Sequence, residues 1–299
     1  MSKSKIGTIA ALVSTVILID LFQNATVYVP PALVIYMATD GDDANRGVDA
    51  GHAIKTLARA QVLVQTEFAK GPRPIEVRIR PGVYFGESLK WTEFSPFKIS
   101  FIGEGPSLDA APAADAERVI FDGRTMATES IGRAISFLNF GDSSISTAAP
   151  PRNIVIDNIT VQNYLEGITF STPDRKNPAR AGSGHVIRNS TFRRIGNMYS
   201  SPLGADGKPL LDNIGRNRPG LAVIRPVNTH NSHFINNRFE DIENFNSTGG
   251  QHPYYFAHYS SGNRIEGNRF VSIRSGTAIN FRDYSNSNVI EKNEFDNVL

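Results

Sequence analysis

Side chains that can move a proton beside a negative charge gather in the C-terminal third of the sequence. His258 can exchange a proton near neutral pH, and Arg225 and Arg282 can each hold a carboxylate by two parallel hydrogen bonds. Asp283 is the acidic residue in the same region. Together they favour proton abstraction next to a carboxylate, in which a cation stabilises the developing charge. We therefore predict His258 and Arg282 as catalytic, and Arg225 and Asp283 as substrate-binding.

Three tyrosines accompany these residues in the aromatic segment 251–259. We predict that Tyr254, Tyr255 and Tyr259 bind substrate, because aromatic faces suit sugar rings and phenols donate hydrogen bonds. The competing interpretation is that a neighbouring His and Asp form only a ladder of surface contacts. Hydrolysis of a glycoside needs two carboxylates about 5 to 9.5 Å apart, and Asp283 is the only acid in this patch.

Composition excludes several other classes of site. The 299 residues contain no cysteine, so disulfides, thiolate zinc sites and thiol nucleophiles are excluded. His230 and His233 are three residues apart, which is weak evidence for a metal site, and we predict none. The net charge of +2 is too small to predict a nucleic-acid partner. From Pro151 to Leu299, 14 Arg and 3 Lys face 13 Asp and Glu, which favours an acidic ligand for this half.

A repeated segment indicates which elements position these side chains. Each copy has alternating apolar residues and an Asn two or three places before a final Phe, and the copies are 186–192, 233–239, 264–270 and 289–295, with a fifth at 155–161 that ends in Val. The final apolar positions are separated by 31, 47, 31 and 25 residues. A fixed pattern at variable spacing indicates one structural coil with loops of different length, and an insertion at about 197–217 explains the longest step.

Such a repeat buries its apolar face only by stacking on its neighbours, with strands about 4.8 Å apart. We therefore predict a parallel strand across each whole copy, with the Phe side chains stacked inside and the Asn side chains hydrogen-bonded along the column. Aligning Phe270 with Phe295 places His258 beside Asp283 and Ala257 beside Arg282.

The equivalent alignment of the preceding pair of coils extends the predicted patch. Aligning Phe239 with Phe270 places Arg225 beside Phe256. The patch would therefore cross three coils, and these neighbours would lie on one face.

The chain resembles right-handed parallel β-helix proteins of the pectate-lyase-like superfamily. The resemblance rests on the opening segment 36–47, on 54–60, on the turn 80–88 with its Arg-Pro-Gly-Val-Tyr sequence, and on the later coils. It implies an all-β, right-handed parallel β-helix solenoid over residues 26–299. It also implies an N-terminal capping helix, which the apolar spacing places at about 56–69.

What this resemblance implies about activity is broad, because such folds serve lyases, hydrolases, C5-epimerases and adhesins. With the predicted patch it favours action on an acidic polysaccharide, by a lyase or C5-epimerase that abstracts the C5 proton. The alternatives are a non-catalytic glycan-binding surface protein or tail-fibre adhesin, and a polysaccharide hydrolase. The resemblance also allows a Ca²⁺ requirement, although the sequence identifies no cofactor.

The two ends of the sequence give two further predictions. Lys3 and Lys5 precede an apolar run from Ile6 to Ile19, which predicts a signal peptide or short membrane anchor in residues 1–25 and an exported protein. At the other end, Leu299 follows the last repeat without a polar capping segment. We expect another subunit, or a longer natural chain, to cover that end.

Overall fold

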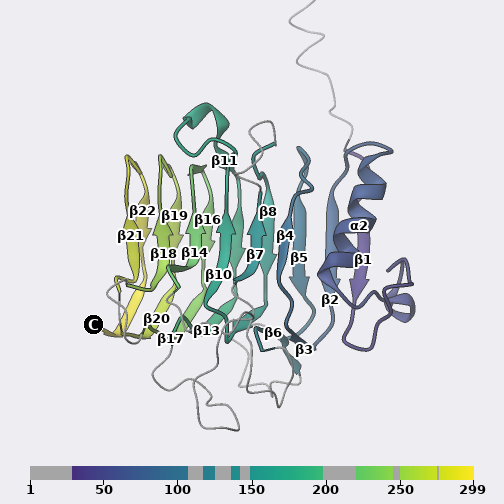
Figure 1. The fold of residues 1–299 in the computed structure, drawn as a ribbon, viewed down its shortest axis with the longest axis horizontal. Helices are drawn as coiled ribbons and strands as arrows, with labels where there is room; N and C mark the ends of the chain where they lie inside the picture. The colour runs from purple at the N-terminus through teal and green to yellow at the C-terminus, as the bar shows by residue number, and fades with distance from the viewer. Residues whose placement is uncertain are drawn as a thin grey trace, which may run out of the picture. The chain divides into compact units, whose positions relative to one another are not determined.

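The computed structural model describes residues 29–106, 117–124, 136–141, 149–197, 220–244, 250–274 and 276–299. The predicted signal or anchor segment 1–25 and nearly all of the predicted insertion 197–217 lie outside these residues. The described part of unit 32–299 is a parallel β-helix, in which consecutive strands visit three parallel sheets in turn. Figure 1 shows the strands stacked in chain order, from the purple N-terminal coils to the yellow C-terminal ones.

Three long sheets, named A, B and C here, make up the walls of the solenoid. Sheet A contains β1 (Leu33–Met37), β2 (Ile75–Ile79), β5 (Ile99–Gly103), β8 (Ile154–Asp157), β12 (Val186–Arg188), β16 (His233–Ile235), β19 (Arg264–Glu266) and β22 (Val289–Glu291). Sheet B contains β3 (Gly82–Phe85), β6 (Val119–Asp122), β9 (Thr160–Gln162), β13 (Thr191–Ile195), β17 (Arg238–Ile242), β20 (Arg269–Ile273) and β23 (Glu294–Val298). Sheet C contains β4 (Leu89–Trp91), β7 (Ser136–Phe140), β10 (Glu166–Phe170), β14 (Ala222–Pro226), β18 (His252–Phe256) and β21 (Ile279–Phe281). The remaining elements are the short pair β11 (Gly182–Ser183) and β15 (Thr229–His230), the helix α2 (Leu57–Phe68), and the 3₁₀ turns η1 (Ala50–His52) and η3 (Pro178–Arg180).

The repeated segment proves to be a corner between sheets A and B, and the prediction of one continuous strand across each copy is wrong. Its fourth residue has positive φ in every copy: Asn158, Asn189, Asn236, Gly267 and Lys292 lie between 52° and 65°. A single left-handed residue turns the chain sharply, and Asn and Gly adopt this conformation most readily. The strand on sheet A therefore ends just before this residue, and the strand on sheet B begins two residues after it.

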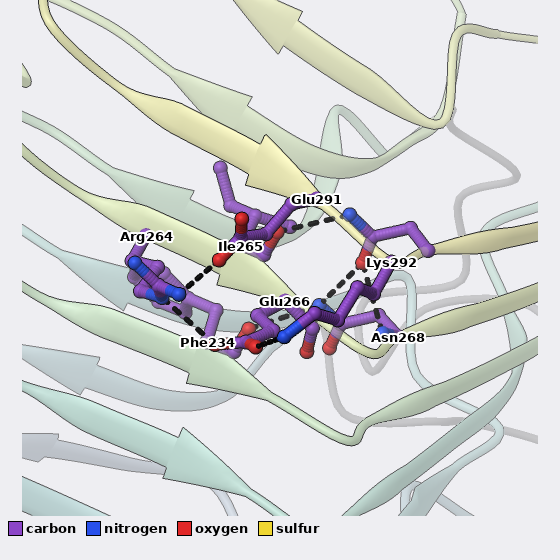
Figure 2. Close-up of polar contacts among 8 residues, drawn as sticks. Phe234, Arg264, Ile265, Glu266, Asn268, Glu291 and Lys292 are labelled. Carbon is purple, nitrogen blue, oxygen red and sulfur yellow. Dashed lines mark hydrogen bonds and ion pairs between the residues drawn. The ribbon is translucent and has the colours of Figure 1, made fainter.

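In the last three copies the residue after the corner is an asparagine, and Asn237, Asn268 and Asn293 form the predicted asparagine ladder. The side-chain oxygen of Asn293 accepts the backbone N–H of Asn268 at 2.8 Å, and that of Asn268 accepts the backbone N–H of Asn237 at 3.0 Å. Asn268 also donates its side-chain amide to the carbonyl of Phe234 at 2.9 Å, as Figure 2 shows. Each amide thus satisfies buried backbone groups that the corner leaves without a strand partner.

The final Phe of each copy stacks inside the solenoid, as predicted. Phe192 and Phe239 lie 5.2 Å apart between ring centroids, Phe239 and Phe270 also 5.2 Å, and Phe270 and Phe295 5.0 Å. The first three are fully buried, whereas Phe295 on the last described coil is 54% exposed. Three further apolar side chains of that coil are exposed: Val289, Ile290 and Leu299.

The helix predicted at 56–69 is confirmed as α2, which lies beside β1 at the N-terminal end of the coils (Figure 1). Thr56 is its N-cap, with a side-chain oxygen that accepts the N–H of Arg59 at 3.1 Å. Leu57, Ala60 and Val64 are its buried residues. Glu87 follows β3 and accepts the N–H of Leu57 at 3.2 Å.

Glu87 is a half-buried carboxyl that makes folding sensitive to pH. Desolvation raises its pKa from 4.5 to about 7, and the N–H of Leu57 only partly offsets this. The folded state therefore holds the proton more tightly than the unfolded state, so stability falls as the pH rises from about 4.5 to about 7. Glu87→Gln should remove this loss and make the protein about 3 kcal/mol more stable than the wild type at pH 8.

Denaturant unfolding at pH 4, 6 and 8 measures this effect. Glu117→Gln, on the exposed surface, is the matched control and should not change the pH profile relative to the wild type. Parallel wild-type and Glu87→Gln profiles would show that the Glu87 carboxyl does not titrate in this range.

Candidate functional site

Four of the predicted site residues follow the ends of sheet C strands, namely His258, Tyr259, Arg282 and Asp283, and the other three, Arg225, Tyr254 and Tyr255, lie within β14 and β18. Phe170 pairs with Pro226, and Phe256 pairs with Phe281, so the segments that follow β10, β14, β18 and β21 emerge at one edge. The bond from the N–H of Arg282 to the carbonyl of Phe256 continues this register beyond the strands. This edge therefore brings His258, Arg282 and Asp283 together, as the coil alignment predicts.

His258 and Asp283 occupy equivalent corners of adjacent coils. Both have positive φ, 51° and 55°, and each is followed by a tyrosine with positive φ, Tyr259 at 63° and Tyr284 at 64°. His258 Nδ1 lies 3.1 Å from a carboxylate oxygen of Asp283. With the Nδ1 proton directed at this carboxylate, the free lone pair of the neutral ring is on Nε2.

Partial burial, aided by neighbouring cations, keeps the ring of His258 neutral. Desolvation lowers its pKa below the usual 6.5; Asp283 opposes this, and the cations Arg175, Arg225 and Lys176 lower the pKa further. At pH 7 the imidazole is therefore predominantly in the form that accepts a proton. A base surrounded by cations is suited to taking a proton from a carbon next to a carboxylate.

Arg282 and Tyr255 form a second contact at this edge. Nη1 of Arg282 donates to the phenol oxygen of Tyr255 at 3.1 Å, and Tyr255 itself is mostly buried. This bond fixes one side of the guanidinium, whose remaining N–H groups can hold an oxyanion.

Tyr255 belongs to a row of mostly polar side chains that crosses sheet C along the solenoid axis. The strand register gives the row in order as Lys90, Asn139, Thr169, Arg225, Tyr255 and Asn280. The residues that follow these six in their strands include the buried Trp91, Phe170 and Phe256, so strand alternation turns the row to the outer face. Within this row, Lys90, Asn139, Arg225 and Asn280 are at least partly exposed, whereas Thr169 and Tyr255 are buried.

Two details of the predicted site are wrong. Tyr254 points into the core, where it is fully buried, packs edge-on against Phe239 and donates its hydroxyl to Asn268 at 3.1 Å, so it cannot bind substrate. Arg225 lies beside Tyr255 and not beside Phe256, because Ile224 pairs with Tyr254.

The register error has a local cause. The corner at Asn228 has one left-handed residue, whereas the next coil has two, His258 and Tyr259. The step between these coils is therefore 30 residues on sheet C, where Ala222 pairs with His252, and 31 on sheet B, where Phe239 pairs with Phe270.

Tyr259 lies at the same edge and stacks on a tyrosine that the sequence prediction missed. The ring centroids of Tyr259 and Tyr284 are 5.4 Å apart with an angle of 16° between the planes, and Tyr284 is 73% exposed. The spacing of 25 residues that relates His258 to Asp283 also relates Tyr259 to Tyr284, so this signal was present in the sequence.

The loop after β10 supplies two further cations that the repeat pattern could not place. Asn228 donates its side-chain amide to the carbonyls of Asp174 at 3.1 Å and Asn177 at 2.7 Å, which fixes the loop at this edge. Arg175 and Lys176 are exposed on it and act electrostatically on His258.

A second cluster of charged side chains, on sheet A, serves as a comparison (Figure 2). Arg264 pairs with Glu266 at 2.7 Å and also with Glu291, while Lys292 pairs with Glu266 at 2.8 Å. Hydrogen bonds from Arg264 and Lys292 lower the pKa of Glu266 to about 2. Because its carboxylate is held ionised, Glu266 cannot supply a proton at neutral pH, and this cluster is a surface ion-pair ladder.

The described residues contain neither a cluster of metal ligands nor a membrane-spanning helix. Within them, no group of three or more His, Asp or Glu side chains is placed to hold a metal ion. Asp43, in the acidic turn after β1, accepts bonds from the backbone of Lys55 and from the hydroxyl of Thr56, so its oxygens hold the turn. No helix in this part of the chain is long and apolar enough to cross a membrane.

Comparisons with known proteins give a remote structural likeness. No family model matches the chain, and no curated protein matches it. Among solved structures, the chain is similar to a GH136 lacto-N-biosidase from Eubacterium ramulus, with 12% sequence identity and a TM-score of 0.31. The match covers 89% of this chain and 68% of that one.

Proposed function

We propose that this parallel β-helix protein acts on an acidic polysaccharide and abstracts the C5 proton of a uronic acid unit, as a lyase or a C5-epimerase. The observation that carries the proposal is the neutral His258, held by Asp283 at 3.1 Å among the cations Arg175, Arg225 and Lys176. The resemblance of the sequence to the pectate-lyase-like superfamily supports it.

In the proposed reaction, His258 acts as the base. Its Nε2 takes the C5 proton, and the electron pair of the broken C–H bond moves into the neighbouring carboxylate, whose charge Arg282 and Arg225 stabilise. In a lyase this pair then forms the C4–C5 double bond as the C4–O bond breaks, and the imidazolium returns its proton to the leaving oxygen. In an epimerase, a water molecule on the opposite face gives a proton to C5, and the hydroxide that this leaves takes the proton from the imidazolium.

A non-catalytic glycan-binding role is the second candidate. The stacked pair Tyr259 and Tyr284 favours it, because an exposed aromatic surface binds sugar rings without any chemistry. Such a protein would be a surface or tail-fibre adhesin. Export is part of either proposal, since these polymers lie outside the cell.

One assay panel separates these functions. Alginate, pectate and glycosaminoglycans would be incubated with the protein, with and without added Ca²⁺. Ultraviolet absorbance from unsaturated uronates would identify a lyase, and deuterium incorporation at C5 without cleavage an epimerase. New reducing ends without unsaturation would contradict proton abstraction and identify a hydrolase, with Asp174 at the same edge as the candidate second carboxylate. Glycan binding without turnover would identify the adhesin.

Arg282→Ala tests the carboxylate clamp. On the polymer that the panel identifies, we expect turnover to fall about 100-fold, because the transition state loses a charged hydrogen-bond donor. Arg188→Ala is the matched control, since Arg188 pairs with Asp157 on sheet A and should not affect turnover. Unchanged turnover in Arg282→Ala, with normal thermal unfolding, would remove Arg282 from the reaction.

A further inference from the structure

The two equivalent corners that follow β18 and β21 have an unusual backbone. His258 and Tyr259 form the first corner, Asp283 and Tyr284 form the second, and all four residues have φ between 51° and 64°. Among the described residues, these are the two places where consecutive residues are left-handed. Left-handed backbone is unfavourable for residues other than Gly, Asn and Asp, and it persists where surrounding contacts hold it, often at functional sites. Specific contacts must therefore hold these corners.

Hydrogen bonds join the backbones of the two corners. The N–H of Tyr259 donates to the carbonyl of Asp283 at 2.8 Å. The N–H of Ser260 donates to the hydroxyl of Ser285 at 3.2 Å, and this hydroxyl donates to the carbonyl of Arg282 at 2.6 Å. These bonds set the spacing of the two chains, but they do not restrict the side chains of the corner residues.

The stacked rings of Tyr259 and Tyr284 add a contact between side chains. Their centroids are 5.4 Å apart and their planes differ by 16°. Each ring directly follows one member of the pair His258 and Asp283, so the rings stay stacked only while both corners keep their left-handed backbone. Because Tyr284 is 73% exposed, its ring contributes little burial to the fold, and its removal acts mainly on the corner.

The preceding coil makes the same corner without a ring. Asn228 is its single left-handed residue, and the next residue, Thr229, begins β15 and is fully buried. The side-chain amide of Asn228 bonds to the loop after β10. The solenoid can therefore turn here with one left-handed Asn. The second left-handed residue, with its ring, is present where the proposed base and its partner lie.

We infer that the stack of Tyr259 on Tyr284 positions the proposed base by keeping Nδ1 of His258 on the carboxylate of Asp283. This inference rests on the proposed function, in which Nε2 of His258 takes the proton. The 3.1 Å contact fixes the tautomer, because the hydrogen bond made by one ring nitrogen determines which nitrogen carries the proton. Without the stack the corners move apart, and part of the population carries its proton on Nε2, where the ring cannot act as the base.

Nitrogen-15 NMR of His258 at pH 8 measures the tautomer without any substrate, and the signals are assigned by their absence in His258→Asn. Tyr284→Phe keeps the ring and should keep the wild-type signals. Tyr284→Ala should shift both ring-nitrogen signals toward those of Asp283→Gly, which allows the left-handed backbone but lacks the carboxylate. Wild-type signals in Tyr284→Ala would overturn the inference.

Two further variants separate the ring from other effects. Phe295→Ala is the matched control, because it removes another exposed ring of the same coil, which stacks on Phe270 at 5.0 Å away from this corner. It should leave the His258 signals unchanged, and a shift as large as in Tyr284→Ala would trace the effect to general loosening of the last coil. Tyr284→Gly relieves the backbone strain and removes the ring, so it should shift the signals as Tyr284→Ala does. Wild-type signals in this variant would assign the effect to the backbone and refute the role of the stack.

Kinetics on the polymer that the assay panel identifies give the second readout. Tyr284→Ala should lower kcat about tenfold at an unchanged KM, because a misplaced base lowers the rate of the chemical step, and Tyr284→Phe should keep the wild-type kcat. A raised KM at an unchanged kcat would instead make the two tyrosines a substrate platform and contradict the inference.

The two readouts fail separately. If turnover requires His258 but its tautomer does not respond to Tyr284, the proposed function stands and this inference is wrong. If the tautomer responds to Tyr284 but no acidic glycan is turned over, the stack holds the contact as inferred and the proposed function is wrong.

Discussion

His258→Ala is expected to lower turnover on the acidic polymer by about 10²- to 10⁴-fold, the range that a positioned general base contributes. The fold should survive, because His258 is a partly exposed residue at a corner and is not part of the apolar core of the described residues. The left-handed backbone at His258 favours Asn as the less strained replacement, so His258→Asn provides a second variant without a base.

The pH profile gives this prediction its sharpest test. Since desolvation and the neighbouring cations lower the pKa of His258, the wild type should keep its activity to below pH 6.5 and lose it as the ring becomes protonated. His258→Ala should abolish this acidic limb in the residual activity. Asp283→Asn keeps a hydrogen-bond partner but removes the charge, so the midpoint of the limb should move to lower pH.

Two outcomes would contradict the role of His258. Full activity in both His258 variants would place the chemistry elsewhere. If the acidic limb of the pH profile is unchanged in His258→Ala, the group that titrates there is not His258. Thermal unfolding of each variant is the control that separates a lost base from a lost fold.

Phe270→Ala is expected to destabilise the protein by about 3 to 5 kcal/mol. The ring is fully buried, and it stacks at 5.2 Å on Phe239 and at 5.0 Å on Phe295. Its removal leaves a cavity between two coils that the hydrogen-bonded strands on either side cannot close. The shift of the denaturant midpoint, at an unchanged dependence of the unfolding free energy on denaturant concentration, measures this loss of stability.

Phe295→Ala is the matched control for this substitution. It removes the same ring from the same stack, but this side chain is 54% exposed, so the expected loss is about 1 kcal/mol. Equal losses in the two variants would mean that burial between coils does not set the energy of the stack. The difference between the two losses in unfolding free energy measures how much packing against a second neighbouring coil stabilises the stack.

The sequence by itself determined the solenoid, because each coil must present the same apolar residues to its neighbours. The separation of 31 residues between Phe239 and Phe270, and of 25 between Phe270 and Phe295, matches the register of sheet B directly. The same logic placed His258 beside Asp283, since a residue at a corner takes its neighbour from the equivalent corner of the next coil.

Only the tertiary structure decided where each coil turns and which side chains face outward. The single left-handed residue at Asn189 or Asn236 divides what looks like one strand into two, and hydrophobic alternation carries no signal for this break. The extra left-handed residue at Tyr259 shifts the register on sheet C by one position, which moves Arg225 to Tyr255.

The repeat pattern also could not predict which way side chains point or where the loops lie. Tyr254 and Tyr255 are chemically identical neighbours, yet alternation along β18 turns the first into the core and the second toward Arg282. Arg175 and Lys176 lie in a loop that the following described coils, which turn at Asn228 and at His258, lack, so its bonds to Asn228 bring their charges to His258. A repeat specifies what lies inside a solenoid, because packing is shared between coils, whereas the corners and loops that build a site are set by contacts peculiar to each coil.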